Sequence, residues 1–264
     1  MAAEIERRGF SGIYCPSFGD AMGLCLSIAH ATTSIEFGTS IQPIYLQHPV
    51  ALATSAAYLH ELSGGRFRLG VGVTHGPVIK RLGVETGKPL SDMREYVGTM
   101  RAAAEQLGGL PPVVLATLRD KMVQLSVEAG DGAVWANASR SRMAHSLSLV
   151  PSQRLATGFW IGNMIPTVID DDLAAARARN RKTLQGYVAL PNYRNYWIEA
   201  GYEAVLAAMS DRWLDDCTLS GPVSRVRDGI EAWFDAGVNA PVVVPSSTSG
   251  GQAKAFAELF AAFA

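Results

Sequence analysis

The stretch IEFGTSIQPIYLQHPVALATSAAYLHELSGGRFRLGVGVT, residues 35–74, decides the fold. It opens with a β-branched and aromatic run, Ile35–Ile41, which predicts a buried strand. Pro49 suits the first turn of a helix, and Gly64–Gly65 suits its left-handed end. Apolar residues recur at helical spacing between them: Leu52, Ala56 and Leu59. Phe67–Gly72 is a second buried run, so the stretch predicts a β-α-β unit, with functional residues just past the carboxyl ends of its strands.

Strand and helix patterns alternate outward from this unit. We predict seven strands, at Gly12–Cys15, Ile35–Ile41, Phe67–Gly72, Val113–Ala116, Gly132–Trp135, Ala156–Ile161 and Pro241–Val244. Helical patterns lie between and around them, at residues 4–8, 21–31, 92–106, 119–129, 140–149, 173–188, 193–213, 222–236 and 252–263. Residues 76–91 are rich in Gly, Pro and Lys and predict a long loop that could act as a lid.

This alternation predicts an α/β fold with parallel strands and right-handed crossovers. We expect one domain over residues 1–264, a TIM-type (β/α)₈ barrel whose first strand is missing, because seven strands are predicted where the barrel needs eight. A helical insertion at about residues 190–220 would follow the strand that is seventh in the full barrel. A doubly wound open sheet is the alternative, but the glycines of Gly70–Gly76 lack the GxGxxG spacing typical of that fold.

Composition excludes several classes of protein. The net charge of −1 gives no basic field for nucleic acid or an anionic membrane. Apolar runs stay well below the ~20 residues of a membrane span, and the charged start MAAEIERRGF lacks a signal-peptide core. Cys15, Cys25 and Cys217 show no metal-site spacing, so we expect buried thiols in a reducing cytoplasm and no metal centre.

Five segments together resemble the bacterial-luciferase-like flavoenzyme superfamily: GFSGIYCPS, IEFGTSIQPIYLQHP, LSGGRFRLGVGVTHG, VEAGDGAVWA and the ending SGP-V-DGIEAWFDAGVNAPVV. The resemblance implies a TIM-like barrel with a flavin or deazaflavin at the carboxyl ends of its strands. It favours the branch that uses coenzyme F420 over the FMN branch. It further implies hydride transfer or oxygen insertion on a small organic substrate, and we also expect a homodimer.

The resemblance also assigns the ring-binding residues. It places a non-proline cis peptide at Ser40–Ile41, against the concave face of the ring; an ordinary trans strand end is the alternative. Val73 and Thr74 follow a predicted strand and would lie at the same rim. His75 stands where F420-dependent dehydrogenases of the family carry an acidic catalytic residue, and it could shuttle a proton or simply donate one loop hydrogen bond. Ser17 and Phe18 replace an Asp and a His of those enzymes, which puts their alcohol or sugar-phosphate chemistry in doubt.

A second group of candidate residues joins a strand end to a helix start: Thr117, Leu118, Asp120 and Lys121. The free N–H groups and positive end of a helix N-terminus suit a phosphate, and Arg119 and Lys121 add charge. Family members often carry glycines where Leu118 and Arg119 stand, so close approach of the backbone to a phosphate is less assured here. A capped helix with a solvated basic turn is the alternative.

Other catalytic motifs are absent from the sequence: HExxH, CxxC, GxSxG and the P-loop GxxxxGK[ST]. We therefore expect an F420- or FMN-dependent oxidoreductase or monooxygenase. The alternative is a non-catalytic flavin-binding protein of the same fold, which the missing first strand and the residues Ser17 and Phe18 favour.

Overall fold

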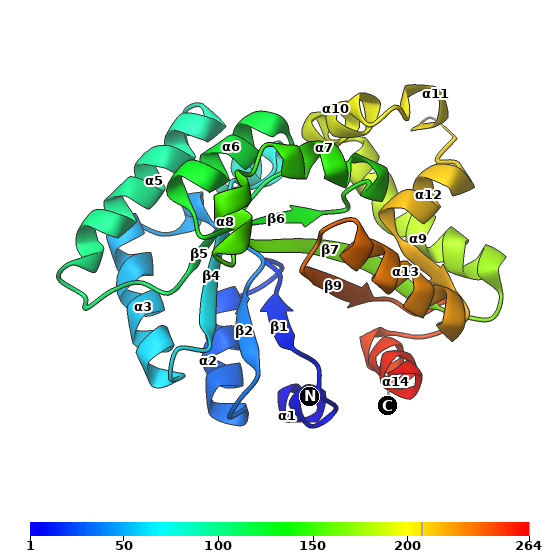
Figure 1. Ribbon diagram of the computed structural model, residues 1–264, viewed down its shortest axis with the longest axis horizontal. Helices are drawn as coiled ribbons and strands as arrows, with labels where there is room; N and C mark the ends of the chain where they lie inside the picture. The colour runs from blue at the N-terminus through cyan, green and yellow to red at the C-terminus, as the bar shows by residue number, and fades with distance from the viewer. Residues whose placement is uncertain (207, 264) are drawn as a thin grey trace. The chain divides into compact units, whose positions relative to one another are not determined.

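The computed structural model describes residues 1–206 and 208–263, whose contacts group into two units (Figure 1). The first unit comprises Met1–Thr117 and Lys121–Val134, and the second comprises Leu118–Asp120 and Trp135–Ala264. Strands and helices alternate in both units. The registered strand pairs are parallel, which confirms the predicted α/β class. The single domain and the barrel lacking its first strand stay predictions.

The first unit contains a parallel sheet in the order β1-β2-β4-β5-β6, with β3 paired to β4. Its strands are β1 (Gly12–Cys15), β2 (Glu36–Thr39), β3 (Gln42–Pro43), β4 (Phe67–Gly72), β5 (Val113–Ala116) and β6 (Gly132–Ala136). Its helices are α1 (Ala2–Arg7), α2 (Ala21–Ala31), the 3₁₀ turn η1 (Ile44–Leu46), α3 (Pro49–Leu62), α4 (Gly76–Leu82), α5 (Pro89–Ala104) and α6 (Asp120–Ala129). Figure 1 shows α2, α3 and α5 along the outer side of these strands.

Helix α3 confirms the apolar face expected from its spacing. It buries Leu52, Ala53, Ala56 and Leu59, and it begins at Pro49 with the His48 side chain accepting from the Val50 N–H. This face packs into a core that includes Phe37 of β2 and Phe67 of β4, whose ring centroids lie 5.6 Å apart. Removal of such apolar surface from water is the main favourable term in folding, so the β-α-β unit carries its own core.

Arg66, between α3 and β4, joins four segments of the first unit. Its Nε donates to the Ser63 carbonyl at the end of α3, at 2.9 Å. Its two terminal nitrogens donate to the carbonyls of Ala29, Thr32 and Ile35 and to the Thr32 hydroxyl, at 2.9–3.2 Å. The guanidinium also lies 5.2 Å from the centre of the Phe37 ring. One side chain thereby satisfies carbonyls that the helix ends leave without partners.

The second unit contains β7 (Trp160–Ile169), which pairs with both β8 (Leu219–Gly221) and β9 (Ala240–Pro245). Its helical segments are η2 (Arg140–Arg142), α7 (Met143–Ser148), α8 (Ser152–Ala156), α9 (Leu173–Val188), α10 (Pro191–Glu199), α11 (Glu203–Leu206), α12 (Asp211–Cys217), α13 (Val223–Asp235) and α14 (Gln252–Ala262). No helix among the described residues is both long and apolar enough to cross a membrane.

Several predicted elements need correction. The loop predicted for residues 76–91 contains α4, because Pro77 fits a first helical turn and Gly83 ends the helix in the left-handed region at φ 64°. The strand predicted at Ala156–Ile161 is instead the end of α8 followed by β7, which starts only at Trp160. The predicted strand Ile35–Ile41 ends at Thr39, and pairing resumes at Gln42 in β3.

The helix predicted at residues 193–213 is broken into α10, α11 and α12. Positive φ angles interrupt it at Gly201 (86°) and Met209 (44°), and residue 207 of the predicted helix lies outside the described part of the chain. Strand β7 is longer than predicted because its apolar run continues through Pro166, a residue type that usually marks a strand edge or end.

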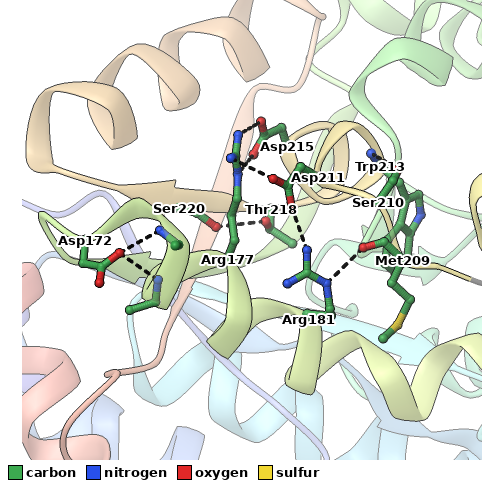
Figure 2. A network of polar contacts seen from close by, with 12 residues as sticks. Asp172, Arg177, Arg181, Met209, Ser210, Asp211, Trp213, Asp215, Thr218 and Ser220 are labelled. Atoms are coloured by element: carbon green, nitrogen blue, oxygen red, sulfur yellow. Dashed lines mark hydrogen bonds and ion pairs between the residues drawn. The ribbon is translucent and has the colours of Figure 1, made fainter.

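Ion pairs hold α12 against α9, as Figure 2 shows. Arg177 of α9 donates to Asp215 at 3.0 and 2.5 Å and to Asp211 at 3.0 Å. Arg181, one turn further along α9, donates to Asp211 at 2.7 Å and to the Met209 carbonyl at 3.0 Å. The bidentate pairing fixes the geometry as well as the charge, so the end of the helical insertion is tied to the helix that precedes it.

Candidate functional site

Strands β2 and β4 approach each other closely because glycines face the contact. A Cβ added at Gly38 would lie 2.3 Å from the Arg68 carbonyl oxygen, and one added at Gly70 would lie 2.1 Å from the Thr39 carbonyl oxygen. Real side chains do not tolerate such distances, so only glycine fits at both positions. The Thr39 hydroxyl, which is buried, then donates to the Gly70 carbonyl at 2.7 Å and fixes the end of β2.

The peptide bond between Ser40 and Ile41 is cis, as the family resemblance implied. The Ser40 N–H donates to the Cys15 carbonyl of β1 at 2.7 Å, which anchors the bond to the neighbouring strand. The Ile41 side chain lies against β4 and β5: a Cβ added at Gly72 would be 2.8 Å from Ile41 Cδ1 and 2.7 Å from the Ala116 Cβ. The ends of three strands therefore meet at Ile41.

Val73, Thr74 and His75 follow β4 directly and are half-buried. His75 is the residue that precedes α4, with an extended backbone and no capping hydrogen bond from its side chain. Burial lowers the pKa of His75 below its ordinary value. The imidazole is therefore neutral at pH 7, the form in which one ring nitrogen can accept a proton and the other can donate one.

Thr117 follows β5 and is the one member of the predicted turn that belongs to the strand ends of the first unit. Its N–H donates to the Val134 carbonyl at 2.8 Å. Its hydroxyl is buried and has no hydrogen-bond partner among the residues that the structure describes. A buried hydroxyl without a partner costs free energy, so Thr117 Oγ1 is a candidate contact for a bound group.

Leu118 and Asp120 group with the second unit, where Asp120 belongs to a charge cluster that was not predicted. Both Asp120 carboxylate oxygens lie 3.1 Å from His145 Nε2, and one lies 3.5 Å from Arg142 Nη2. Arg142 also contacts the Glu199 carboxylate at 3.3 Å, and Arg119 forms an ion pair with the same carboxylate. Lys121 is exposed in the first turn of α6.

Sequence reasoning also missed a polar contact that holds the segment after β3. The Tyr45 hydroxyl donates to an Asp92 carboxylate oxygen of α5 at 2.7 Å, and the Gly87 N–H donates to the same oxygen at 2.9 Å. Burial, followed by the hydrogen bond to Asp92, raises the pKa of Tyr45. No local pattern could reveal this contact, because 47 residues separate its partners.

The strand ends of the first unit contain groups of the kinds that a flavin or deazaflavin ring needs, apolar surface and a polar atom. Ile41 supplies apolar surface there, packed with Ala116 against the bare backbone of Gly72, and the buried Thr117 hydroxyl has no partner among the described residues. Phe18 is 88% exposed and the Ser17 side chain is exposed as well, so neither residue forms an enclosed acid–base site within this unit.

Comparison with known proteins gives one family and several related structures. Residues 1–240 match the family model of luciferase-like monooxygenases. A Mycobacterium tuberculosis protein named as a candidate coenzyme F420-dependent oxidoreductase is 26% identical over 94% of this chain and 90% of its own length.

Two solved structures show the same fold. An F420-dependent secondary alcohol dehydrogenase, in complex with an F420-acetone adduct, matches with a TM-score of 0.76 and 15% identity, over 100% of this chain and 93% of its own. The oxygenating constituent of 3,6-diketocamphane monooxygenase from Pseudomonas putida, in complex with FMN, matches with a TM-score of 0.68 and 17% identity, over 99% and 88%.

Gly70→Ala should destabilise the protein by about 2–3 kcal/mol, because the added Cβ forces β2 away from β4 and disturbs the bond from the Thr39 hydroxyl. The matched control is Gly98→Ala in the interior of α5, where an added Cβ meets no atom within 4 Å. This control should gain about 0.5–1 kcal/mol from better helix propensity. Urea unfolding followed by circular dichroism measures both, and equal effects of the two changes would contradict the role of the close approach.

His75→Gln should reduce the loss of stability on acidification. The folded pKa of His75 lies below its ordinary value near 6.5, so the unfolded chain takes up a proton that the folded chain resists. This contribution is complete above pH ~6.5 and is lost as the pH falls through the lowered pKa. The measurement is the free energy of unfolding in urea at pH 7.5 and at pH 5.5; an unchanged difference in the variant would show that His75 does not titrate in this way.

Proposed function

Because the chain belongs to the luciferase-like monooxygenase family, we propose that it is an oxidoreductase that uses a deazaflavin or flavin. The meeting of Ile41, Gly72 and Ala116 at the ends of three strands carries this proposal. It would offer apolar surface to a planar ring, and Thr117, whose buried hydroxyl has no partner among the described residues, directly follows Ala116 in the chain. The substrate would be a small organic molecule.

Coenzyme F420 is the preferred cofactor in this proposal, with FMN as the alternative. A relative of similar length is named for F420, and an F420-dependent dehydrogenase shares the fold. An FMN-bound monooxygenase shares the fold as well, so FMN is the alternative cofactor. A bound deazaflavin supplies hydride exchange, and a bound reduced flavin supplies oxygen activation.

The residues of this chain would orient the ring and move a proton. Ser40 and Ile41 would support one face of the ring, and Val73 and Thr74 its edge. The Thr117 hydroxyl would bond a ring heteroatom. His75, neutral because of its burial, would exchange a proton with the substrate. Leu118, Asp120 and Lys121 stay predicted contacts for the remainder of the cofactor.

Titration with F420 and with FMN tests the proposal, using fluorescence to follow binding. We expect a dissociation constant in the micromolar range or below for one of them, and weaker binding by Thr117→Val, which keeps the shape but lacks the hydroxyl. The loss should be about three- to tenfold for one neutral hydrogen bond. Failure of both cofactors to bind would contradict the proposal.

Hydride uptake or oxygen consumption with candidate substrates then separates an enzyme from a non-catalytic flavin-binding protein. Binding without turnover over a broad set of carbonyl and alcohol substrates would favour the non-catalytic alternative. That alternative draws on the exposed Phe18 and on Ser17, which stand where related dehydrogenases carry acid–base residues.

We further propose a homodimer that buries the outer faces of α2 and α3. Helix α2 has no Asp, Glu, Lys or Arg, and α3 has a single one, Glu61. Large apolar side chains are nevertheless exposed on both helices: Leu24 (49%), Leu26 (40%), Val50 (41%), Tyr58 (60%) and Leu62 (39%). Exposed apolar surface of this kind, concentrated on two neighbouring helices, is typical of a protein interface.

Tyr58→Glu combined with Leu24→Glu should yield a monomer where the parent chain is a dimer, because association would bury two unpaired charges on each subunit. Phe234→Glu on α13 is the control, since Phe234 is 46% exposed but lies on another helix. Size-exclusion chromatography with light scattering gives the mass. A monomeric parent chain, or a dimer that survives the double change, would contradict the proposed interface.

A further inference from the structure

Two of the three cysteines of the chain lie together in the core of the first unit. Cys15 is the last residue of β1 and is 5% exposed, and Cys25 lies on α2 and is completely buried. The buried residues of α2 are Ala21, Cys25 and Ile28, which share one face of the helix. The thiols of Cys15 and Cys25 are both free and are joined by a hydrogen bond. The two side chains therefore point toward each other, as a disulfide requires.

The hydrogen bond makes the two thiols unequal. The Cys25 S–H donates to the Cys15 sulfur, which lowers the pKa of Cys15 below its ordinary value although burial opposes this shift. The same bond, followed by burial, raises the pKa of Cys25. Because the thiolate is the nucleophilic form of a cysteine, Cys15 is the more reactive member of the pair. A cysteine oxidised to sulfenic acid condenses with a neighbouring thiol, and Cys25 is placed to be that thiol.

Cys15 lies at the edge of the core, beside an exposed loop. The five residues that follow it, Pro16–Asp20, are all exposed. The loop can therefore be approached by a molecule as small as hydrogen peroxide. The Cys15 carbonyl also accepts from the Ser40 N–H at 2.7 Å. A change at Cys15 thus takes place next to the strand end that carries the candidate ring-binding residues.

We propose that Cys15 and Cys25 form a redox modification site, which hydrogen peroxide converts into a disulfide within the chain. The Cys15 thiolate first attacks one peroxide oxygen, the O–O bond breaks, and the products are a sulfenic acid and hydroxide, which takes up the proton lost by Cys15. The Cys25 sulfur then attacks the sulfur of the sulfenic acid. The S–S bond forms, the S–OH bond breaks, and the Cys25 proton leaves with the hydroxyl group as water. The two sulfurs lose two electrons to the peroxide, and two molecules of water are released.

Cys217 provides an internal comparison in the second unit. It is completely buried, its sulfur lies 3.4 Å from the Ser139 hydroxyl, and burial raises its pKa. A buried thiol with a raised pKa reacts slowly with oxidants. Cys217 should therefore stay reduced under conditions that oxidise the pair.

Peptide mapping of the parent chain tests the proposal. Trypsin cleaves after Lys and Arg, so Cys15 and Cys25 fall together in the peptide of residues 9–66, and Cys217 falls in that of residues 213–225. The native protein is treated with millimolar hydrogen peroxide, quenched with catalase, denatured, alkylated and digested. We expect peptide 9–66 to lose both alkylation sites together with two hydrogen atoms of mass, roughly tenfold faster than Cys217 is lost. Dithiothreitol should restore both sites.

Cys25→Ser tests the roles of the two thiols, because it keeps a hydrogen-bond donor beside Cys15 and removes the second sulfur. Sulfenic acid on Cys15 should then persist and be trapped by dimedone on peptide 9–66. Cys217→Ser is the matched control and should form the disulfide at the rate of the parent chain. Circular dichroism checks the fold of both variants, and the mapping of the parent chain depends on neither.

Several results would overturn the proposal. They are two alkylation sites retained in peptide 9–66 after peroxide treatment, a loss of sites that dithiothreitol does not reverse, a disulfide that joins two chains, and oxidation of Cys217 as fast as the pair. A folded Cys25→Ser variant that dimedone does not label would overturn the assignment of Cys15 as the thiol attacked first. The proposal goes beyond the flavin chemistry proposed above and does not rest on it, because the oxidant is added.

Discussion

The close approach of β2 and β4 is the constraint on which the candidate site depends. Gly38 and Gly70 put hydrogen atoms where any other residue would place a Cβ within 2.3 Å of a carbonyl oxygen. The resulting spacing lets the Thr39 hydroxyl reach the Gly70 carbonyl. It also carries Ile41 across to Gly72 and Ala116, so backbone geometry rather than any catalytic side chain creates the apolar seat.

The two groups of residues predicted to contact a cofactor differ in charge. The strand ends around Ile41 and Thr117 contain apolar surface, a buried hydroxyl without a partner among the described residues, and the imidazole of His75, whose pKa is lowered by burial. The turn at Asp120, by contrast, is rich in charge but balanced within itself.

The sequence was most informative where structure depends on neighbours along the chain. The β-α-β unit, the helix Leu173–Val188 and the strand Val113–Ala116 follow from local periodicity. The bounds of this helix and this strand agree with prediction, whereas the first strand of the β-α-β unit is shorter than predicted. Helix α4 was missed because its glycine and proline were taken as loop signals, although both occupy helix-terminal positions. The start of β7 was misplaced because a continuous apolar run has no period that marks its ends.

The candidate site likewise contains features that could be identified from the sequence and features that only the folded chain shows. The cis bond at Ser40–Ile41 was identified through family resemblance, since no local property of these two residues predicts it. The partners of Asp120, which are Arg142 and His145, lie 22 and 25 residues away in sequence, so only the folded chain shows that its carboxylate is paired. Tyr45 and Asp92 were missed for the same reason.

Arg66 is a single side chain that connects segments distant from it in sequence. Its guanidinium makes five hydrogen bonds in one plane, to acceptors from the ends of two helices and the start of a strand. A lysine ammonium has three donors on a single nitrogen and no planar face to lay against Phe37. Arg66→Lys would preserve the charge and the approximate length of the side chain. It would nevertheless leave backbone carbonyl oxygens without hydrogen-bond donors where α2, α3 and β2 meet.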